Sequence, residues 1–233
     1  MSSLDERLIA RMLHHRTGNL EPGQPVQATL SPASTYFLPG TPNAKHQYGR
    51  WSNPTWEVLE DALAILEDAP VAIFPSGMAA IASVFMTHLG TGDRVLLPSD
   101  GYYTTRVLVE KYLAPHGVEV ELRATADYAT QDLSGFKLVF IETPSNPGLD
   151  ICDVAEVAGR AKAAGALVVA DNTTMTPLGQ RPLNLGADLV VASDTKALNG
   201  HSDVLFGHVA ARDAGLLEPV RDWRKFVGAI PGP

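Results

Sequence analysis

The feature that most constrains the fold is a regular alternation of short apolar runs and helical stretches after residue 70. The apolar runs are rich in β-branched residues and occupy residues 71–74, 94–97, 118–122, 137–142, 166–170, 189–193 and 205–210. Between several of them, residues 77–89, 103–114 and 153–164 have the spacing of helices. Strands that alternate with helices indicate a mostly parallel sheet covered on both faces. We therefore expect an α/β fold with a seven-stranded sheet, in which the nearly all-apolar runs LVVAD and LVVAS are central strands.

The first 55 residues have a different character. Prolines interrupt them repeatedly, and only residues 4–15 have a helical pattern, whereas residues 56–68 form a clear amphipathic helix. A segment with so little structure of its own needs a surface to lie on, either its own domain or a neighbouring subunit. We predict an extended arm, residues 1–55, followed by an α/β domain, residues 56–233. Because the chain stops in a Gly/Pro turn just after apolar residues, we expect the α/β domain to be truncated there.

Composition and motifs argue against several classes of protein. The net charge is −8 and the basic residues are scattered, so no surface for nucleic acid is expected. No apolar run approaches the roughly 20 residues of a membrane-spanning helix. The single Cys152 cannot form an internal disulfide, which favours a cytoplasmic protein. The glycine-rich nucleotide loops and the zinc-protease and serine-hydrolase motifs are missing, and the seven histidines lack ligand spacing, so we expect no metal site.

Two features follow expected strands at the edge where open α/β sheets bind ligands. In PSGMAA, residues 75–80, a helix begins with small residues, and the N–H groups of Gly77 and Met78 could bind an anion. Ser-Gly before a helix is more often an ordinary cap. Asp171 ends a buried strand, where a carboxylate is costly unless it faces a cation or a strong donor. A cap for the next helix is an equally good interpretation of Asp171.

Two further features lie at the same edge. Lys196 is the only one of the six lysines directly after a buried strand, in a turn where Ser193 and Thr195 offer hydroxyls to a phosphate. A desolvated lysine in such a place can form a Schiff base, although a lone lysine there is more often a surface residue. Tyr102 supplies an aromatic ring, unless it only covers the core. An anion site, a carboxylate, a lysine and a flat ring together match the needs of pyridoxal 5′-phosphate (PLP).

Five motifs also stand in the chain in a familiar order. They are YGRWSNPT (48–55), SGMAA (76–80), ETPSNP (142–147), VVADNT (168–173) and SDTKALNGHSD (193–203). With them, most of residues 46–233 resembles the Cys/Met-metabolism family of PLP-dependent enzymes. That family includes cystathionine γ-lyase, β-lyase and γ-synthase, methionine γ-lyase and the homoserine sulfhydrylases. The fold that the resemblance implies is the large domain of a fold type I PLP-dependent transferase.

The resemblance implies a role for each candidate residue. Lys196 would form the Schiff base (internal aldimine) with the cofactor and take the Cα proton of the substrate, and Asp171 would pair with the pyridine nitrogen. Tyr102 would stack on the ring, and Asn146 would lie near the 3′-oxygen. Tyr102, and Tyr48 from the neighbouring subunit, are candidates to assist the leaving sulfur. The phosphate would be held by Gly77, Met78, Ser193 and Thr195. Tyr48 and Arg50 would reach the phosphate in a neighbouring subunit of a homotetramer built from two dimers.

The function that the resemblance implies is a C–S lyase of sulfur amino-acid metabolism that cleaves cystathionine by γ- or β-elimination. Alternatives are a cystathionine γ-synthase or O-acylhomoserine sulfhydrylase, which replace a γ-substituent, and a non-catalytic PLP-binding fragment. After Tyr102 many family members have Gly-Gly-Thr or Gly-Cys-Thr. This chain has Tyr103-Thr104-Thr105, which argues against a methionine γ-lyase. Family members also have a smaller C-terminal domain, whose arginine binds the substrate carboxylate, and we expect the residues of this chain not to include it.

Overall fold

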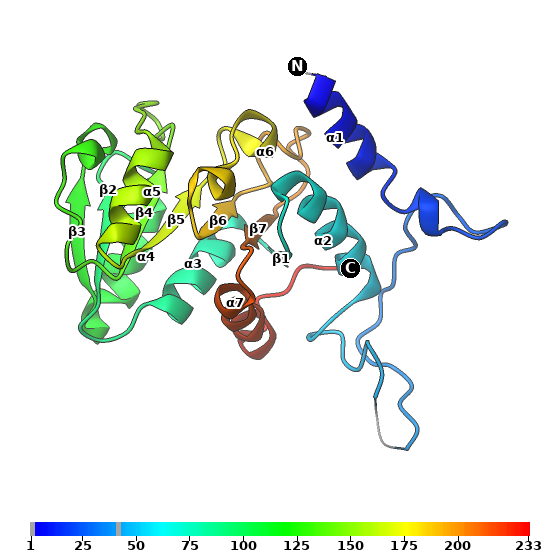
Figure 1. Ribbon diagram of the computed structural model, residues 1–233. Coiled ribbons are helices and arrows are strands. Elements are labelled where there is room, and N and C mark those ends of the chain that lie inside the picture. The colour runs from blue at the N-terminus through cyan, green and yellow to red at the C-terminus, as the bar shows by residue number, and fades with distance from the viewer. Residues whose placement is uncertain (1–2, 41–42) are drawn as a thin grey trace.

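The computed structural model describes residues 3–40 and 43–233, and a seven-stranded sheet forms its centre (Figure 1). The strands stand in the order β1-β7-β6-β5-β4-β2-β3. The five strands β6, β5, β4, β2 and β3 pair in parallel, each with the next in this order, and β7 is antiparallel to both β1 and β6. This confirms the expected fold. The strands are β1 (Val71–Phe74), β2 (Arg94–Pro98), β3 (Glu119–Arg123), β4 (Leu138–Glu142), β5 (Leu167–Asp171), β6 (Leu189–Ala192) and β7 (Gly207–Ala210).

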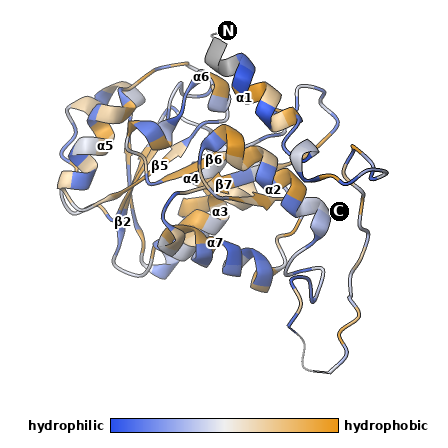
Figure 2. Ribbon diagram, turned by 45° about the vertical axis from the view of Figure 1, so that its right-hand side comes forward, coloured by the Kyte–Doolittle hydropathy of each residue, from blue (hydrophilic) through white to orange (hydrophobic). Residues whose placement is uncertain are grey.

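Helices cover both faces of the sheet. One face packs on α3 (Gly77–His88), α4 (Tyr103–Tyr112) and α7 (Ala214–Val227), and the other on α2 (Pro54–Glu67) and α5 (Val154–Ala163). Successive strand residues enter opposite cores, as Val190 and Val191 do in β6. Figure 2 shows the resulting concentration of hydrophobic residues along the central strands and α3. Within the part of the chain that the structure describes, no helix is long and apolar enough to cross a membrane.

Shorter elements complete the connections. They are α6 (Thr176–Gly179) and the 3-10 turns at Thr17–Asn19, Ala114–His116, Thr125–Ala129 and Pro182–Leu185. Helix α7 is not among the helices expected from the sequence, and it contains Pro219 within its span. Asp213 caps its start by accepting from the N–H of Gly215 at 2.7 Å, and Gly228 ends it in the left-handed conformation. Buried Arg224 then joins α7 to α2 through a 2.6 Å ion pair with Glu60.

The predicted arm is only partly extended. Helix α1 (Ser3–Leu13) packs on α2 through the buried side chain of Leu8. Beyond it the chain has little regular structure up to Asn53, whose side chain caps α2 and so starts that helix at Pro54. Hydrophobic side chains of this stretch, such as that of Phe37, are exposed. Positions 1, 2, 41 and 42 lie outside the described residues. A contact of the arm with a neighbouring subunit stays a prediction.

Candidate active site

A cavity of about 240 Å³ opens at the carboxyl edge of the sheet. Its walls come from the starts of α3 and α4 and from the loops that follow β4, β5 and β6. The structure brings most of the predicted site residues together there. The predicted residues that line it are Gly77, Met78, Tyr102, Asn146, Asp171, Ser193, Thr195 and Lys196.

The start of α3 forms one wall of the cavity. Ser76 has an extended backbone, and its hydroxyl accepts from the N–H of Ala79 at 3.1 Å, so it is the N-cap. Gly77 and Met78 follow as the first two helical residues, whose N–H groups have no acceptor within a helix. From the sequence alone the cap and the anion site are alternatives, but in the structure they are compatible. The Ser76 hydroxyl accepts only from the N–H of Ala79, so the N–H groups of Gly77 and Met78 in the cavity wall remain free for an anion.

Asp171 is the last residue of β5 and is only 7% exposed. Burial raises the pKa of this carboxyl, and hydrogen bonds from Thr173 oppose the effect. The Thr173 hydroxyl donates to Asp171 Oδ1 at 2.5 Å, and its N–H does so at 3.0 Å. The interpretation of Asp171 as the cap of the next helix is wrong, because α6 begins five residues later and has no side-chain cap. A carboxylate held this way, with a raised pKa, gains from a positively charged partner in the cavity.

Thr173 is a site residue that the sequence analysis missed. While donating to Asp171, its hydroxyl accepts from the backbone N–H of Ser193 at 2.8 Å. One hydroxyl therefore joins the carboxylate at the end of β5 to the turn that follows β6. The only sequence signal was a pair of threonines just after a strand, which does not indicate a bridge between two loops.

Glu142 was missed as well. It ends β4 in register with Asp171 on β5, is 5% exposed and lines the cavity. Burial and then the charge of Asp171 raise the pKa of Glu142 to about 7. Its Oε2 accepts from the backbone N–H of Tyr102 at 2.6 Å, which fixes the residue before α4. The argument that drew attention to Asp171, a carboxylate at the end of a buried strand, applies equally to Glu142 and could have found it.

Lys196 stands in a turn closed by the bond from its N–H to the Ser193 carbonyl at 3.1 Å. Its side chain lines the cavity, but the residue is exposed. Of the two placements considered for Lys196, desolvated or at the surface, the structure shows the surface one, because the turn carries Lys196 to the mouth of the cavity. The hydroxyl of Thr195 is already engaged: it donates to the Phe206 carbonyl at 3.0 Å and accepts from the Phe206 N–H at 2.9 Å.

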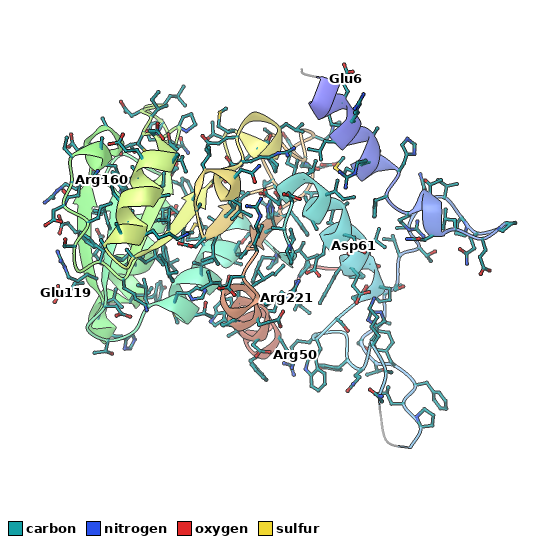
Figure 3. All side chains as sticks on the ribbon, in the orientation of Figure 1. Glu6, Arg50, Asp61, Glu119, Arg160 and Arg221 are labelled. Carbon is teal, nitrogen blue, oxygen red and sulfur yellow. The ribbon has the colours of Figure 1, made fainter. Side chains whose placement is uncertain are left out.

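Tyr48 and Arg50 do not line this cavity. Arg50 donates to the backbone carbonyl of Lys225 in α7, and its guanidinium lies 5.2 Å from the ring centre of Tyr48. Figure 3 shows Arg50 beside α7, on the side where the arm passes. The structure thus separates these two residues from the site of their own chain. Their role in a neighbouring subunit stays a prediction.

The donor set fits PLP. Amide N–H groups of a first helical turn suit a phosphate, the exposed Lys196 amine suits an aldehyde, and the buried Asp171 carboxylate suits a protonated ring nitrogen. Tyr102, 41% exposed at the cavity wall, offers its ring face. Among residues 3–40 and 43–233, no group of three or more His, Cys, Asp or Glu side chains is placed to hold a metal ion.

Comparison with known proteins agrees with this chemistry. A model of the Cys/Met metabolism PLP-dependent enzymes matches residues 12–233. A protein of Streptomyces coelicolor named putative cystathionine gamma-lyase is 54% identical over 207 residues, which cover 86% of this chain and 53% of the relative. Cystathionine beta-lyase MetC of Bacillus subtilis is 40% identical over 191 residues, which cover 80% of this chain and 49% of the relative.

The solved structures include a similar fold. The crystal structure of cystathionine gamma synthase from Xanthomonas oryzae pv. oryzae, in complex with cystathionine, has a TM-score of 0.89 and 34% identity. The match covers 97% of this chain and 60% of that one. This chain spans about half the length of the curated relatives that it matches.

Proposed function

This chain belongs to the Cys/Met metabolism family of PLP-dependent enzymes, and we propose that it acts as a C–S lyase that cleaves cystathionine by γ- or β-elimination. The observation that carries the proposal is the meeting of Lys196, Asp171 and the start of α3 around one cavity. The names of the similar proteins, a gamma-lyase and a beta-lyase, support the substrate class.

When bound, PLP supplies an aldehyde that captures amines and a protonated ring that withdraws electrons. Lys196 Nζ would hold the cofactor by its aldehyde carbon and would be the group that accepts the proton from the substrate Cα. Its position at the mouth of the cavity, on a short turn, suits both tasks. Asp171 would pair with the ring nitrogen and keep it protonated, and Thr173 orients the carboxylate through its two hydrogen bonds.

The remaining residues bind and orient. The first-turn N–H groups of α3 and the side chain of Ser193 hold the phosphate, with Thr195 placing the turn beside it through its bonds to Phe206. Tyr102 covers one ring face and is the candidate to assist the departing sulfur, and Glu142 fixes its backbone. Asn146 lies at the cavity wall for the 3′-oxygen.

Incubation with cystathionine tests the lyase function. Release of 2-oxobutyrate indicates γ-elimination and release of pyruvate indicates β-elimination, and the Lys196→Ala variant should form neither. A chain that carries PLP and forms neither product contradicts a lyase.

A γ-replacement activity is the second candidate, favoured by the 0.89 TM-score match to a cystathionine gamma synthase. It predicts a thioether when an O-acylhomoserine ester and a thiol are supplied together. A third candidate is a PLP-binding unit without turnover. It predicts bound PLP and no product from either substrate.

We also propose that residues 1–55 lie on a neighbouring subunit and that residues 56–233 form the PLP-binding domain. Exposed Val26, Leu30 and Phe37 give the arm apolar surface for such a contact, and Tyr48 and Arg50 would reach the neighbour's phosphate. The assembly would be a dimer of dimers with shared sites. The half-buried Cys152, free of any disulfide, supports a cytoplasmic location.

A further inference from the structure

Three ionisable side chains lie buried together behind the turn that carries Lys196. His208 of β7 is fully buried, and Glu67 and Asp194 are 1% and 5% exposed. His208 Nδ1 lies 2.9 Å from both carboxylate oxygens of Asp194, and Nε2 lies 3.1 Å from Glu67 Oε1. The proposed reaction uses none of the three.

The sheet separates this cluster from the phosphate site. Gly207 packs against the start of α3, since a Cβ atom there would lie 2.6 Å from the nitrogen of Gly77. The next residue, His208, points to the opposite face, where α2 ends with Glu67. In the turn after β6, successive side chains also point to opposite sides. Ser193 and Thr195 line the cavity, and Asp194 between them reaches back to His208.

His208 is a buried cation between two carboxylates. Burial alone would lower its pKa, but Asp194 first and then Glu67 outweigh burial and raise the pKa of His208 to about 10. Both ring nitrogens then donate hydrogen bonds. Among the residues that the structure describes, Glu67 Oε2 has no hydrogen-bond partner. A buried ionic cluster with an unsatisfied oxygen contributes little to the stability of the fold, which points to another role for these three residues.

We propose that His208 is a positioning residue: its Nδ1 anchors the carboxylate of Asp194 and so fixes the turn at residues 193–196. The turn takes its shape from its own bonds, from the Lys196 N–H to the Ser193 carbonyl at 3.1 Å and from the Asn199 N–H to the Asp194 carbonyl at 2.9 Å. The Asp194 side chain joins that turn to the sheet. The cluster thereby sets where the lysine and the hydroxyls stand at the cavity.

Two substitutions of His208 each keep one of the hydrogen bonds of the imidazole and remove the other. In His208→Asn the side-chain amide replaces Nδ1 and keeps a donor toward Asp194. In His208→Gln it replaces Nε2 and keeps a donor toward Glu67. Each variant leaves one buried carboxylate without its partner, so both should lose comparable stability against urea. Only His208→Gln should free the turn.

The first readout is hydrogen exchange of residues 193–200 in the chain without PLP. We expect exchange at least about tenfold faster in His208→Gln, because a hydrogen bond to a charged group is lost, and near the wild-type rate in His208→Asn. The second readout is the dissociation constant of PLP, expected to rise about tenfold in His208→Gln alone. His88→Gln is the matched control. His88 contacts the Leu216 carbonyl, away from the turn, and its substitution should change neither readout.

Equal acceleration in the two His208 variants, or none in either, overturns the positioning role. If His208→Gln does not fold, Asp194→Ala and Glu67→Ala replace the pair: exchange at residues 193–200 should rise in the first only, and equal rates overturn the proposal. The second readout rests on the proposed function, but the first does not. A wild-type chain that fails to bind PLP therefore contradicts the proposed function, while the exchange rates still decide the role of His208.

Discussion

Gly77 and Ser193 meet at the wall of the cavity: a Cβ atom on Gly77 would lie 2.5 Å from the Cβ of Ser193. The first residue of α3 therefore packs directly against the turn that carries Lys196. The two parts of the proposed phosphate site, helix start and turn, keep this spacing only because residue 77 has no side chain.

Gly77→Ala should damage both stability and PLP binding. The added methyl forces the helix start and the turn apart, which costs about 1–3 kcal/mol of the free energy of unfolding. Urea unfolding and a PLP titration measure the two effects. Gly159→Ala is the control, because Gly159 lies in α5 with open space around its Cβ position and should gain about 0.5–1 kcal/mol. Equal effects of the two substitutions would contradict the close approach.

Asp171→Asn should separate stability from PLP binding. The raised pKa of Asp171 means that its ionised form costs stability above its ordinary pKa of 3.8, so the amide should leave the PLP-free chain at pH 7 equally or more stable. PLP affinity should fall at least about tenfold, because the ring nitrogen loses a charged partner. Thermal unfolding and absorbance titrations measure the two. Asp61→Asn, on the exposed side of α2, should change neither. Unchanged PLP affinity in Asp171→Asn would be the contrary result.

Glu142 should make the stability of the PLP-free chain pH-dependent. Because its pKa is raised from 4.5 to about 7, its contribution is complete below pH 4.5 and is lost as the pH rises through 7. Glu142→Gln should remove this loss, about 3 kcal/mol of the free energy of unfolding. Urea unfolding from pH 4 to 8 measures it. Glu110→Gln, at an exposed position of α4, should keep the wild-type slope. A wild-type slope in Glu142→Gln would show that Glu142 ionises normally.

Mixing variants tests the shared site. Lys196→Ala and Arg50→Ala chains, refolded together, should form dimers in which one site has both Lys196 and the neighbour's Arg50. In a random mixture about a quarter of all sites are of this kind. Tight PLP binding that borohydride fixes should therefore recover to about a quarter of the wild-type amount. If Arg50 acts within its own chain, the mixture should bind no more tightly than Arg50→Ala alone.

The sequence predicts the sheet well because its signals are local. Runs such as Leu189–Ala192 are buried on both faces, so nearly every residue is apolar and the strand is visible by itself. Helix α7 is the exception, because it contains Pro219, a residue that usually ends a helix. Contacts with distant residues hold it in place, such as the pairing of Arg224 with Glu60 and the burial of Leu217 and Val220 in the core.

In the candidate site, too, the sequence reveals the residues with local signals and misses those that depend on distant contacts. Lys196 and Asp171 are visible as polar residues that follow or end strands. The motifs of the family point to further residues of the cavity wall, but also to Tyr48 and Arg50, which do not line it. The bridge from Thr173 to Ser193 and the contact of Glu142 with the Tyr102 N–H join segments 20 and 40 residues apart in the chain. Such pairs depend on which strands are neighbours in the sheet, and a single sequence does not contain that order.

The most direct test asks which amine binds PLP. The chain is incubated with PLP, reduced with borohydride and digested, and the modified peptide is located by mass spectrometry. We expect an adduct on Lys196, at the cavity mouth, and the loss of that adduct with little labelling elsewhere in Lys196→Ala. Label spread over exposed lysines such as Lys111 and Lys162, with none on Lys196, would contradict the proposed active site.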